Sequence, residues 1–350
     1  MLLREYKNRK VLVTGHTGFK GSWLTSYLIE LGAEILGYSL EFNTNPNMFS
    51  TINNMEKLKN VFGDIRDEEK LTKTIMEFKP DIIFHLAAQP LVRSSYEKPK
   101  LTYETNLIGT LNLYEASRKC NSIKAIVTIT TDKCYENKEW IYGYRETDPM
   151  GGYDPYSSSK GCVELLSSSY RRSFMNEIGI LLATARAGNV IGGGDWSEDR
   201  LVPDLVRALS KNEPITIRNP FAVRPWQYIL DPLTGYLMLG AELLNGNQEF
   251  ATGWNFGPND TDVLSVKSIL DECIKVWGTG SYQVDKRDQP HEANLLKLDI
   301  SKAVGQLKWR TKYNVYEAIN KTISWYKEFY DDKENMENYT LKQIKEYINL

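Results

Sequence analysis

The chain has 350 residues, of which 41% are hydrophobic and 25% charged, so the sequence predicts one large or two closely packed globular domains. Its 43 basic and 45 acidic residues leave a net charge of −2, which gives no reason to expect nucleic acid or an anionic membrane as a partner. No apolar run approaches the roughly 20 residues that cross a bilayer, the first ten residues do not resemble a secretory signal, and the scattered cysteines indicate free thiols, so we expect a cytoplasmic protein.

The first half of the chain alternates short β-branched runs with helical patterns. Strands that alternate with helices are typical of βαβ units with a parallel sheet and right-handed crossovers. We therefore predict an α/β fold with a Rossmann-type, doubly wound parallel sheet. The expected elements are a strand at 10–14, a helix at 22–31, a strand at 33–40, a helix at 67–78, a strand at 81–85, a helix at 101–118, a strand at 124–129, a helix at about 155–177 and a strand at 180–185.

Beyond residue 186 the pattern is less regular. Prolines punctuate short elements, residues 192–195 form a predicted turn, and residues 341–348 a short terminal helix. No linker rich in Gly or Ser, repeat or low-complexity tract separates this part from the first. We expect two domains, 1–186 and a smaller, irregular α/β part at 187–350, with some strands and helices of the second part returning to the first.

A glycine-rich segment follows the first predicted strand. Gly15, Gly18 and Gly21 are spaced G-x-x-G-x-x-G, where glycines let backbone N–H groups approach a pyrophosphate at the start of the next helix. The pattern alone is weak, but its place in a βαβ run favours a dinucleotide site. Ser39 stands where an acidic ribose contact is expected, and Glu41 comes late. No arginine cluster follows the second strand to hold an extra phosphate, so we predict NAD rather than NADP.

Tyr156 and Lys160 lie four residues apart, on one face of a predicted helix. A nearby ammonium favours phenolate and lowers a tyrosine pKa from about 10, so such a pair can remove a hydroxyl proton while hydride leaves the same carbon. Alone, the pair is more often an ordinary surface feature. Thr131, Asp132 and Lys133, however, end an earlier strand at the edge where doubly wound sheets bind ligands. Oxidation needs only the hydroxyl, so the added acid and base indicate a further step.

These segments resemble the extended short-chain dehydrogenase/reductase superfamily, in its epimerase/dehydratase branch, and in detail the CDP-glucose 4,6-dehydratases. The resemblance implies an NAD-binding domain at 1–186 that carries the catalytic Tyr/Lys helix, and a mainly nucleotide-sugar-binding part at 187–350. It runs from about residue 8 to residue 230 and is weaker beyond. The matching segments are 15–23, 85–90, 130–135, 153–160, 186–196 and 224–227.

The resemblance implies a three-step reaction. Tyr156 takes the proton of the C4 hydroxyl as hydride passes from C4 to NAD, water is then eliminated across C5 and C6, and hydride returns to C6. The product would be a CDP-4-keto-6-deoxyglucose, used for deoxysugars of surface polysaccharides such as lipopolysaccharide O-antigen. Many such dehydratases carry Asp-Glu where this chain has Asp132-Lys133, and the CDP-glucose group is the one expected to carry Lys. A base has to be neutral and an acid protonated, so we expect these two side chains to diverge rather than pair.

The resemblance also implies which residues act and bind. The catalytic residues would be Thr131, Asp132, Lys133, Tyr156 and Lys160. The cofactor contacts would be Gly15, Thr17, Gly18, Phe19, Lys20, Gly21, Asp64, Ile65, Leu86, Ala87, Ala88 and Asn106. The nucleotide-sugar contacts would be Gln89, Arg93, Asn189, Arg200, Leu201, Arg218, Arg224 and Arg287. Guanidinium groups suit phosphate, although each arginine alone fits a surface role equally well. A homodimer through the helices at 101–118 and 155–177 is implied, and no metal site is expected because the three histidines lie far apart.

Other functions stay open at this point. A nucleotide-sugar 4-epimerase needs the tyrosine and lysine but no eliminating acid, so Asp132 argues against it. A dehydratase for GDP-mannose or dTDP-glucose would differ in the nucleobase pocket, which the C-terminal pattern does not reveal. A non-catalytic dinucleotide sensor tends to lose the Tyr/Lys pair, which is intact here.

Overall fold

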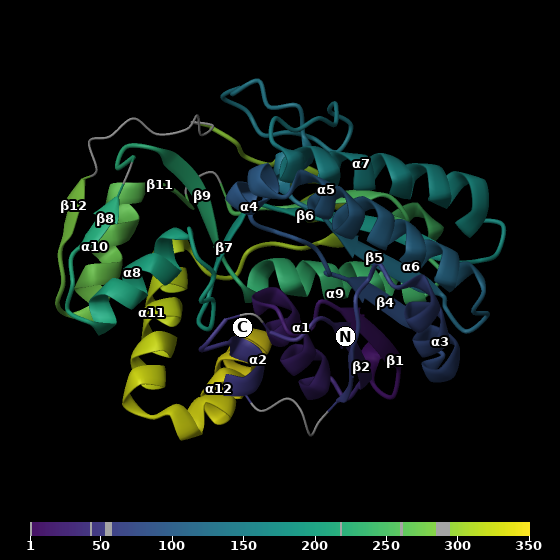
Figure 1. The fold of residues 1–350 in the computed structure, drawn as a ribbon, viewed down its shortest axis with the longest axis horizontal. Helices are drawn as coiled ribbons and strands as arrows, with labels where there is room; N and C mark the ends of the chain where they lie inside the picture. The colour runs from purple at the N-terminus through teal and green to yellow at the C-terminus, as the bar shows by residue number, and fades with distance from the viewer. Residues whose placement is uncertain (1, 43, 53–57, 218, 260–261, 285–294) are drawn as a thin grey trace.

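The centre of the computed structural model is a seven-stranded sheet in the order β10-β6-β5-β4-β1-β2-β3 (Figure 1). The structure describes residues 2–42, 44–52, 58–217, 219–259, 262–284 and 295–350. Every neighbouring pair in this sheet is parallel, and the chain winds outward from β1 in both directions. The predicted doubly wound sheet is therefore confirmed. Its strands are β1 (Lys10–Thr14), β2 (Glu34–Ser39), β3 (Lys59–Phe62), β4 (Ile82–His85), β5 (Ala125–Ile129), β6 (Leu181–Ala187) and β10 (Gly253–Phe256).

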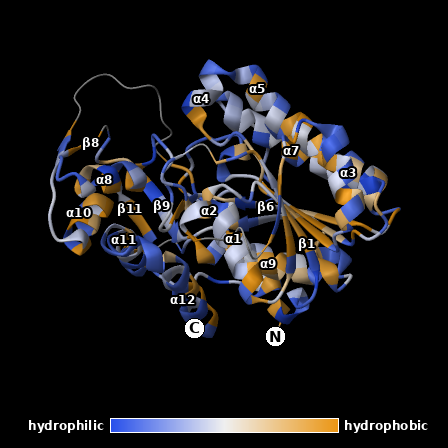
Figure 2. Cartoon of the chain, turned by 60° about the horizontal axis from the view of Figure 1, so that its bottom comes forward, coloured by the Kyte–Doolittle hydropathy of each residue, from blue (hydrophilic) through white to orange (hydrophobic). Residues whose placement is uncertain are grey.

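Helices cover both faces of the sheet because its strands are apolar on both sides. Successive strand residues point to opposite faces. Val11 packs in one core with Trp23 and Leu237, whereas its neighbour Leu12 packs in a second core with Leu113. Figure 2 shows the apolar strands between the two helical layers. One layer contains α1 (Phe19–Glu30) and α9 (Leu230–Leu244), and the other α3 (Glu68–Phe78), α6 (Gly109–Arg118) and α7 (Pro155–Tyr170).

Four helices differ from their predicted bounds by more than one residue. The terminal helix expected at 341–348 begins earlier, as α12 (Met336–Asn349). α1 begins at Phe19 rather than residue 22, because Gly18 is already its N-cap. The helix expected at 101–118 is α5 (Pro99–Tyr103), a π-helical turn at Glu104–Ile108 and then α6. α7 likewise ends in a π-helical turn, Arg171–Met175. Short helices α2 (Met48–Thr51) and α4 (Val92–Glu97) and a 3-10 turn at Leu2–Tyr6 complete this part.

The chain beyond residue 186 forms a second lobe and also returns to the main sheet. β10 pairs with β6, and α9 covers the sheet, whereas two small sheets, β11-β9-β7 and β12-β8, lie in the second lobe (Figure 1). Where the two domains divide remains a prediction. The elements here are β7 (Asn189–Ile191), α8 (Leu201–Ser210), β8 (Ile215–Ile217), β9 (Val223–Tyr228), β11 (Val263–Ser265), α10 (Val266–Trp277), β12 (Tyr282–Val284), α11 (Val315–Asp331) and α12 (Met336–Asn349).

One buried carboxylate ties the C-terminal helix to the sheet-covering helix α9. Asp231, in the first turn of α9, is fully buried. Its Oδ1 accepts hydrogen bonds from the Tyr347 hydroxyl at 2.6 Å and from the Lys312 backbone N–H at 2.7 Å. Burial raises the pKa of Asp231 to about 7. The carboxyl group is therefore a structural part of the fold that still titrates near neutrality.

Asp231 should make the stability of the fold depend on pH. Its pKa is about 7 in the folded protein and about 3.9 in an unfolded chain, so between these values the folded state holds a proton that the unfolded state has lost. Stability contributed by this group is complete below about pH 4 and falls as pH rises, by at most about 1.4 kcal/mol per unit. Asp231→Asn keeps an oxygen for both donors and should flatten this slope in urea unfolding between about pH 5 and about pH 8. Equal slopes for variant and parent would contradict the assignment.

Candidate active site

The glycine-rich loop after β1 forms an open cradle at the start of α1. Gly15 has φ +74°, and a Cβ there would lie 2.7 Å from the Ala87 backbone nitrogen. A Cβ on Gly21 would lie 2.1 Å from the Gly15 carbonyl oxygen, whereas one on Gly18 would meet nothing closer than 3.4 Å. Gly15 and Gly21 therefore hold the loop against the end of β4, and Gly18 leaves space at a helix N-terminus that no side chain caps. Such a cradle fits the pyrophosphate of a dinucleotide.

Hydrogen bonds join the ends of β1 and β4 beneath this cradle. The Thr14 hydroxyl lies 2.7 Å from His85 Nδ1 and accepts from the Ala87 backbone N–H at 3.2 Å. His85 Nε2 lies 2.9 Å from the Thr110 hydroxyl of α6. The predicted contact segment Leu86–Ala88 is thereby held directly beside the glycine loop.

Hydroxyl groups, rather than a carboxylate, lie at the end of β2. The Thr17 hydroxyl is 2.8 Å from the Ser39 hydroxyl and donates to the Leu40 carbonyl at 3.0 Å. Glu41 is exposed. The carboxylate of Asp64 accepts a hydrogen bond from the Arg66 guanidinium at 2.6 Å. This contact is sufficient to explain an aspartate at the turn after β3. Phe19 and Lys20 lie in the first turn of α1, and Ile65 directly follows Asp64.

Asn106, in the π-helical turn, connects the loop after β4 to α7. It is buried, accepts from the Gln89 backbone N–H at 2.8 Å, and donates to the Ser159 hydroxyl at 2.8 Å. The side-chain amide of Gln89 donates to the Leu91 carbonyl and to the Thr102 hydroxyl. A substrate contact by Gln89 would have to displace these bonds.

Tyr156 and Lys160 project from one face of α7 toward the end of β5. The ammonium of Lys160 is buried and donates to the Ile129 carbonyl at 3.1 Å. Burial lowers the pKa of Lys160 to about 8, against the opposing charge of Glu164. Burial raises the pKa of Tyr156 to about 12, although the Thr131 hydroxyl opposes this. The expectation of a lowered phenol pKa is therefore not met by the protein alone, because burial outweighs the Thr131 hydroxyl and the charge of Arg200, which lower the pKa of Tyr156.

After β5, Thr131 leads into a 3-10 turn, Asp132–Cys134, which contains Asp132 and Lys133. The Thr131 hydroxyl caps the turn by accepting from the Lys133 N–H at 3.3 Å and donates to Asp132 Oδ1 at 3.0 Å. Asp132 is buried and Lys133 exposed, and in the described part of the chain no ion pair joins them. Burial raises the pKa of Asp132, which favours its protonated form. A Cβ at residue 188 would lie 2.9 Å from Asp132 Oδ2, so the glycine there makes room for the carboxyl.

Two further cations act on the same site. Burial lowers the pKa of Lys20 to about 8, Arg200 lowers it further, and Asp132 raises it. Arg200 is held by an ion pair with Asp195 at 2.9 Å. Lys20, Lys160 and Arg200 thus lie in one electrostatic cluster with two buried acids, Asp132 and Asp195, and the excess of cations suits an anionic ligand.

A pocket of about 210 Å³ lies in the second lobe. It brings together Asn189, Leu201 and Arg224, three of the residues expected to contact a nucleotide sugar. Arg93 instead pairs with Asp199, on the pocket wall, at 2.8 Å. Arg218 and Arg287 lie outside the described residues. The rest of the lining is Asp204, Ile215, Thr216, Ile217, Asn219, Ala222, Trp226 and Val266.

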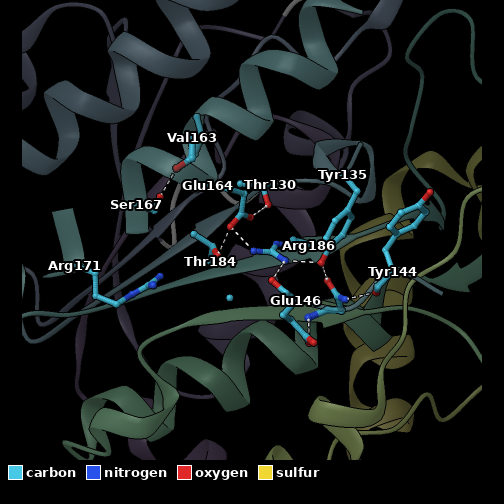
Figure 3. Close-up of polar contacts among 12 residues, drawn as sticks. Thr130, Tyr135, Tyr144, Glu146, Val163, Glu164, Ser167, Arg171, Thr184 and Arg186 are labelled. Carbon is cyan, nitrogen blue, oxygen red and sulfur yellow. Dashed lines mark hydrogen bonds and ion pairs between the residues drawn. The ribbon is translucent and has the colours of Figure 1, made fainter. Parts of the chain in front are cut away.

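The sequence analysis missed Glu164, which lies one helical turn beyond Lys160. Its buried carboxylate accepts from Arg186 of β6 at 2.7 Å (Figure 3). The spacing of Tyr156, Lys160 and Glu164, four residues each, was the signal that could have revealed it. Among the described residues no group of three or more His, Cys, Asp or Glu side chains is placed to hold a metal ion, and no helix there is long and apolar enough to span a membrane.

Comparison with known proteins gives one family model and several relatives. The model for GDP-mannose 4,6-dehydratase matches residues 12–322. The chain is 48% identical to the CDP-glucose 4,6-dehydratase of Salmonella typhimurium, over 98% of this chain and 97% of that protein. A Thermus thermophilus UDP-glucose 4-epimerase solved with NAD has a TM-score of 0.78 and 25% identity, covering 91% of this chain and 99% of that one. A Streptomyces venezuelae dTDP-glucose 4,6-dehydratase, also solved with NAD, has a TM-score of 0.79 and 21% identity, covering 94% and 99%. These matches span both the main sheet and the second lobe.

Proposed function

The chain belongs to the GDP-mannose 4,6-dehydratase family, and from this premise we propose that it converts CDP-glucose to CDP-4-keto-6-deoxyglucose by NAD-dependent removal of water. The observation that carries the proposal is a buried acid, Asp132, at the same strand end as Thr131 and opposite Tyr156 and Lys160. An oxidation or epimerisation at C4 has no use for such an acid. The choice of CDP-glucose rests on the 48% identical relative and on Lys133 after Asp132.

NAD fits the cradle formed by the glycine loop. The glycine loop leaves room at the first turn of α1, which no side chain caps, for the pyrophosphate, and Thr17 and Ser39 offer hydroxyls near the end of β2. Leu86, Ala87 and Ala88 would line the other side. When bound, NAD would supply a hydride acceptor for C4, a hydride donor for C6, and a positive charge that would favour the Tyr156 phenolate.

Tyr156 and Lys160 carry out the first step in this proposal. The phenol takes the C4 hydroxyl proton, and the Thr131 hydroxyl holds the oxygen that loses it. Because the pKa of Tyr156 is about 12 in the protein alone, the phenolate depends on cations that arrive or approach when the site is filled. Lys160 supplies one of them from the same helix face.

Asp132 and Lys133 carry out the elimination. The 4-keto group acidifies the C5 hydrogen, which Lys133 removes, and Asp132 donates a proton to the departing C6 hydroxyl. Lys133 then returns a proton to C5 as hydride is added to C6. Burial favours the protonated form of Asp132, as a donor requires. Lys133 is exposed, so the sugar itself would cover its amine when it acts.

Positive groups at the boundary of the lobes would hold the diphosphate, and the second-lobe pocket would hold the nucleoside. Arg200 lies between Asp199 and Leu201 of the pocket wall and acts electrostatically on Tyr156. This supports a binding mode in which the phosphates lie between the base and the reacting sugar. In this scheme residues 1–186 bind mainly NAD, and residues 187–350 bind mainly the nucleotide sugar.

A panel of nucleotide hexoses tests the proposed function. The purified protein with NAD should convert CDP-glucose to a product with the ultraviolet absorbance of 4-keto sugars in alkali, and should do so at least tenfold faster than with dTDP-glucose, UDP-glucose or GDP-mannose, because one base fits the pocket best. Preference for another nucleotide would reassign the substrate. Turnover of none of the four would refute dehydration.

Variants of the adjacent residues Asp132 and Lys133 distinguish removal of the C5 proton from protonation of the departing C6 hydroxyl. Lys133→Ala should abolish exchange of the C5 hydrogen with solvent deuterium while C4 oxidation continues, since only the base is lost. Asp132→Asn should allow C5 exchange but lower water loss by about 100-fold or more, because the leaving group lacks its donor. Mass spectrometry of recovered substrate and product measures both. Normal C5 exchange in Lys133→Ala would rule out this base.

We also place the enzyme in the cytoplasm as a homodimer. All four cysteines are free thiols, as in a reducing compartment. α5, the π-helical turn and α7 pack side by side, and Ile108 and Leu165 of these segments are 43% and 62% exposed. Light scattering should give twice the chain mass of 40.2 kDa, and Leu165→Glu should reduce it. A parent mass of one chain would exclude the dimer.

A further inference from the structure

A buried network links α7 to two neighbouring strands behind the active site (Figure 3). The side chains of Glu164 and Arg186 are only 4% and 5% exposed and form an ion pair at 2.7 Å. Glu164 also accepts from the Thr130 hydroxyl at 2.5 Å and from the Thr184 hydroxyl at 2.7 Å. Arg186 donates in addition to the Tyr135 hydroxyl at 2.5 Å. The carboxylate is therefore fully engaged by β5 and β6, although nothing in the proposed reaction uses it.

The network fixes how α7 sits against the end of β5. Tyr156, Lys160 and Glu164 follow one another at single helical turns. Lys160 donates to the carbonyl of Ile129, and Glu164 accepts from Thr130, the next residue. Of the two contacts, only that of Glu164 continues to a second strand. A shift of the helix along the sheet would therefore break the Glu164 bonds first.

The same carboxylate is the opposing charge that keeps Lys160 an ammonium. Burial lowers the pKa of Lys160 to about 8, and Glu164 is the leading influence that raises it. Although burial alone would raise the pKa of Glu164, the Arg186 guanidinium lowers it, so Glu164 stays charged. A neutral Lys160 would offer Tyr156 no positive charge.

We infer that Glu164 is a positioning residue of the enzyme, which sets the register of α7 through Thr130 and Arg186 and maintains the charge of Lys160. The inference deepens the proposed function, on which its activity readout rests. It stands geometrically on three contacts between buried side chains and on the hydrogen bond from Lys160 to the Ile129 main-chain carbonyl.

Several other groups face this pair and belong to the same electrostatic balance. The charge of Lys160 lowers the pKa of His85 in β4 and of Lys20 in α1, and Cys134 raises the pKa of Lys160. The charge of Glu164 raises the pKa of Tyr114 in α6, of Arg171 and of Cys134. In the described part of the chain, none of these groups forms an ion pair with Glu164 as Arg186 does, so Arg186 is the residue to vary with it.

The test compares Glu164→Gln, the double variant Glu164→Gln with Arg186→Met, and Glu77→Gln as a control. Glu77 is 69% exposed and forms only a surface pair with Lys73 at 3.9 Å. The titration of Lys160 is followed by nuclear magnetic resonance of protein labelled at the lysine ε-carbon and assigned with Lys160→Met. We expect the Lys160 midpoint to fall by about one pH unit or more in both Glu164 variants and to stay unchanged in Glu77→Gln.

A merely structural role predicts a different pattern. Glu164→Gln should lower the thermal unfolding temperature because Arg186 is left buried without its partner, and the double variant should regain much of it. If the double variant also regained the parent's Lys160 midpoint, Glu164 would be only a structural partner and the inference would be wrong. Should Glu164→Gln fail to fold, the double variant still decides the question, since it leaves no unpaired buried charge.

Activity supplies a second readout. With CDP-glucose, both Glu164 variants should lose about tenfold or more in kcat at neutral pH, with KM changed less than twofold, because the loss falls on proton transfer rather than binding. An unchanged kcat would overturn the inference. If the parent turned over no nucleotide hexose, the proposed function would fail, while the Lys160 titration would still test Glu164 by itself.

Discussion

The seating of α7 on the end of β5 is the contact on which the rest of the site depends. It brings a phenol, an ammonium and a carboxylate, one turn apart, against three successive residues of a single strand end. Helix and strand repeat at different intervals, so only one register satisfies the Ile129 carbonyl and the Thr130 hydroxyl together. The turn that carries Asp132 starts directly after these residues, so their contacts with α7 also fix where the turn lies. Proton donor and phenol are thus placed relative to each other by backbone, not by a flexible loop.

This arrangement is costly, because it gathers charge where water is largely excluded. Lys160 and Asp132 are both buried, and burial lowers the pKa of the lysine and raises that of the acid. A buried charge costs several kcal/mol unless it is paired. Behind the site, Glu164 forms an ion pair with Arg186. The cations that face the ligand sites, such as Lys20, outnumber the anions near them. A dinucleotide and a diphosphate would complete the balance, which is why the Tyr156 phenolate is expected only in the filled site.

The sequence predicted the elements that repeat and missed those that depend on distant packing. β1, β4 and β5 were predicted to within one residue, because strands buried on both faces are continuous apolar runs. The strand β3 (Lys59–Phe62) was not predicted, because this short edge strand is half polar. α8 and α9 were also missed because Pro203 and Pro232 looked like breaks; both lie in a first turn, where a missing N–H costs nothing.

The same distinction holds for the candidate site. Its local motifs, the glycine loop and the Tyr/Lys pair, are visible because their residues are neighbours in sequence. The bonds of Asn106 to Gln89 and Ser159 join three separate segments, so no spacing reveals them. The prediction of a lowered Tyr156 pKa was wrong for a related reason: it counted the ammonium, a neighbour on the helix, and not the burial that the whole fold imposes. The second-lobe pocket likewise exists only once β7, β9 and α8 meet.

The segment from Gly192 to Arg200 determines how far that pocket lies from the cradle. A Cβ on Gly193 would lie 2.1 Å from the ring of Trp325 in α11, and the Gly193 carbonyl accepts from Trp23 of α1 at 2.8 Å. The chain is therefore clamped between a helix of the cofactor cradle and a helix of the second lobe. Asp195, which follows, holds Arg200 at the point where the pocket wall meets the phenol. Because both sides of the segment are held by buried contacts, the distance between the pocket and the cradle is set by the packing of this segment between α1 and α11 and not by a flexible loop.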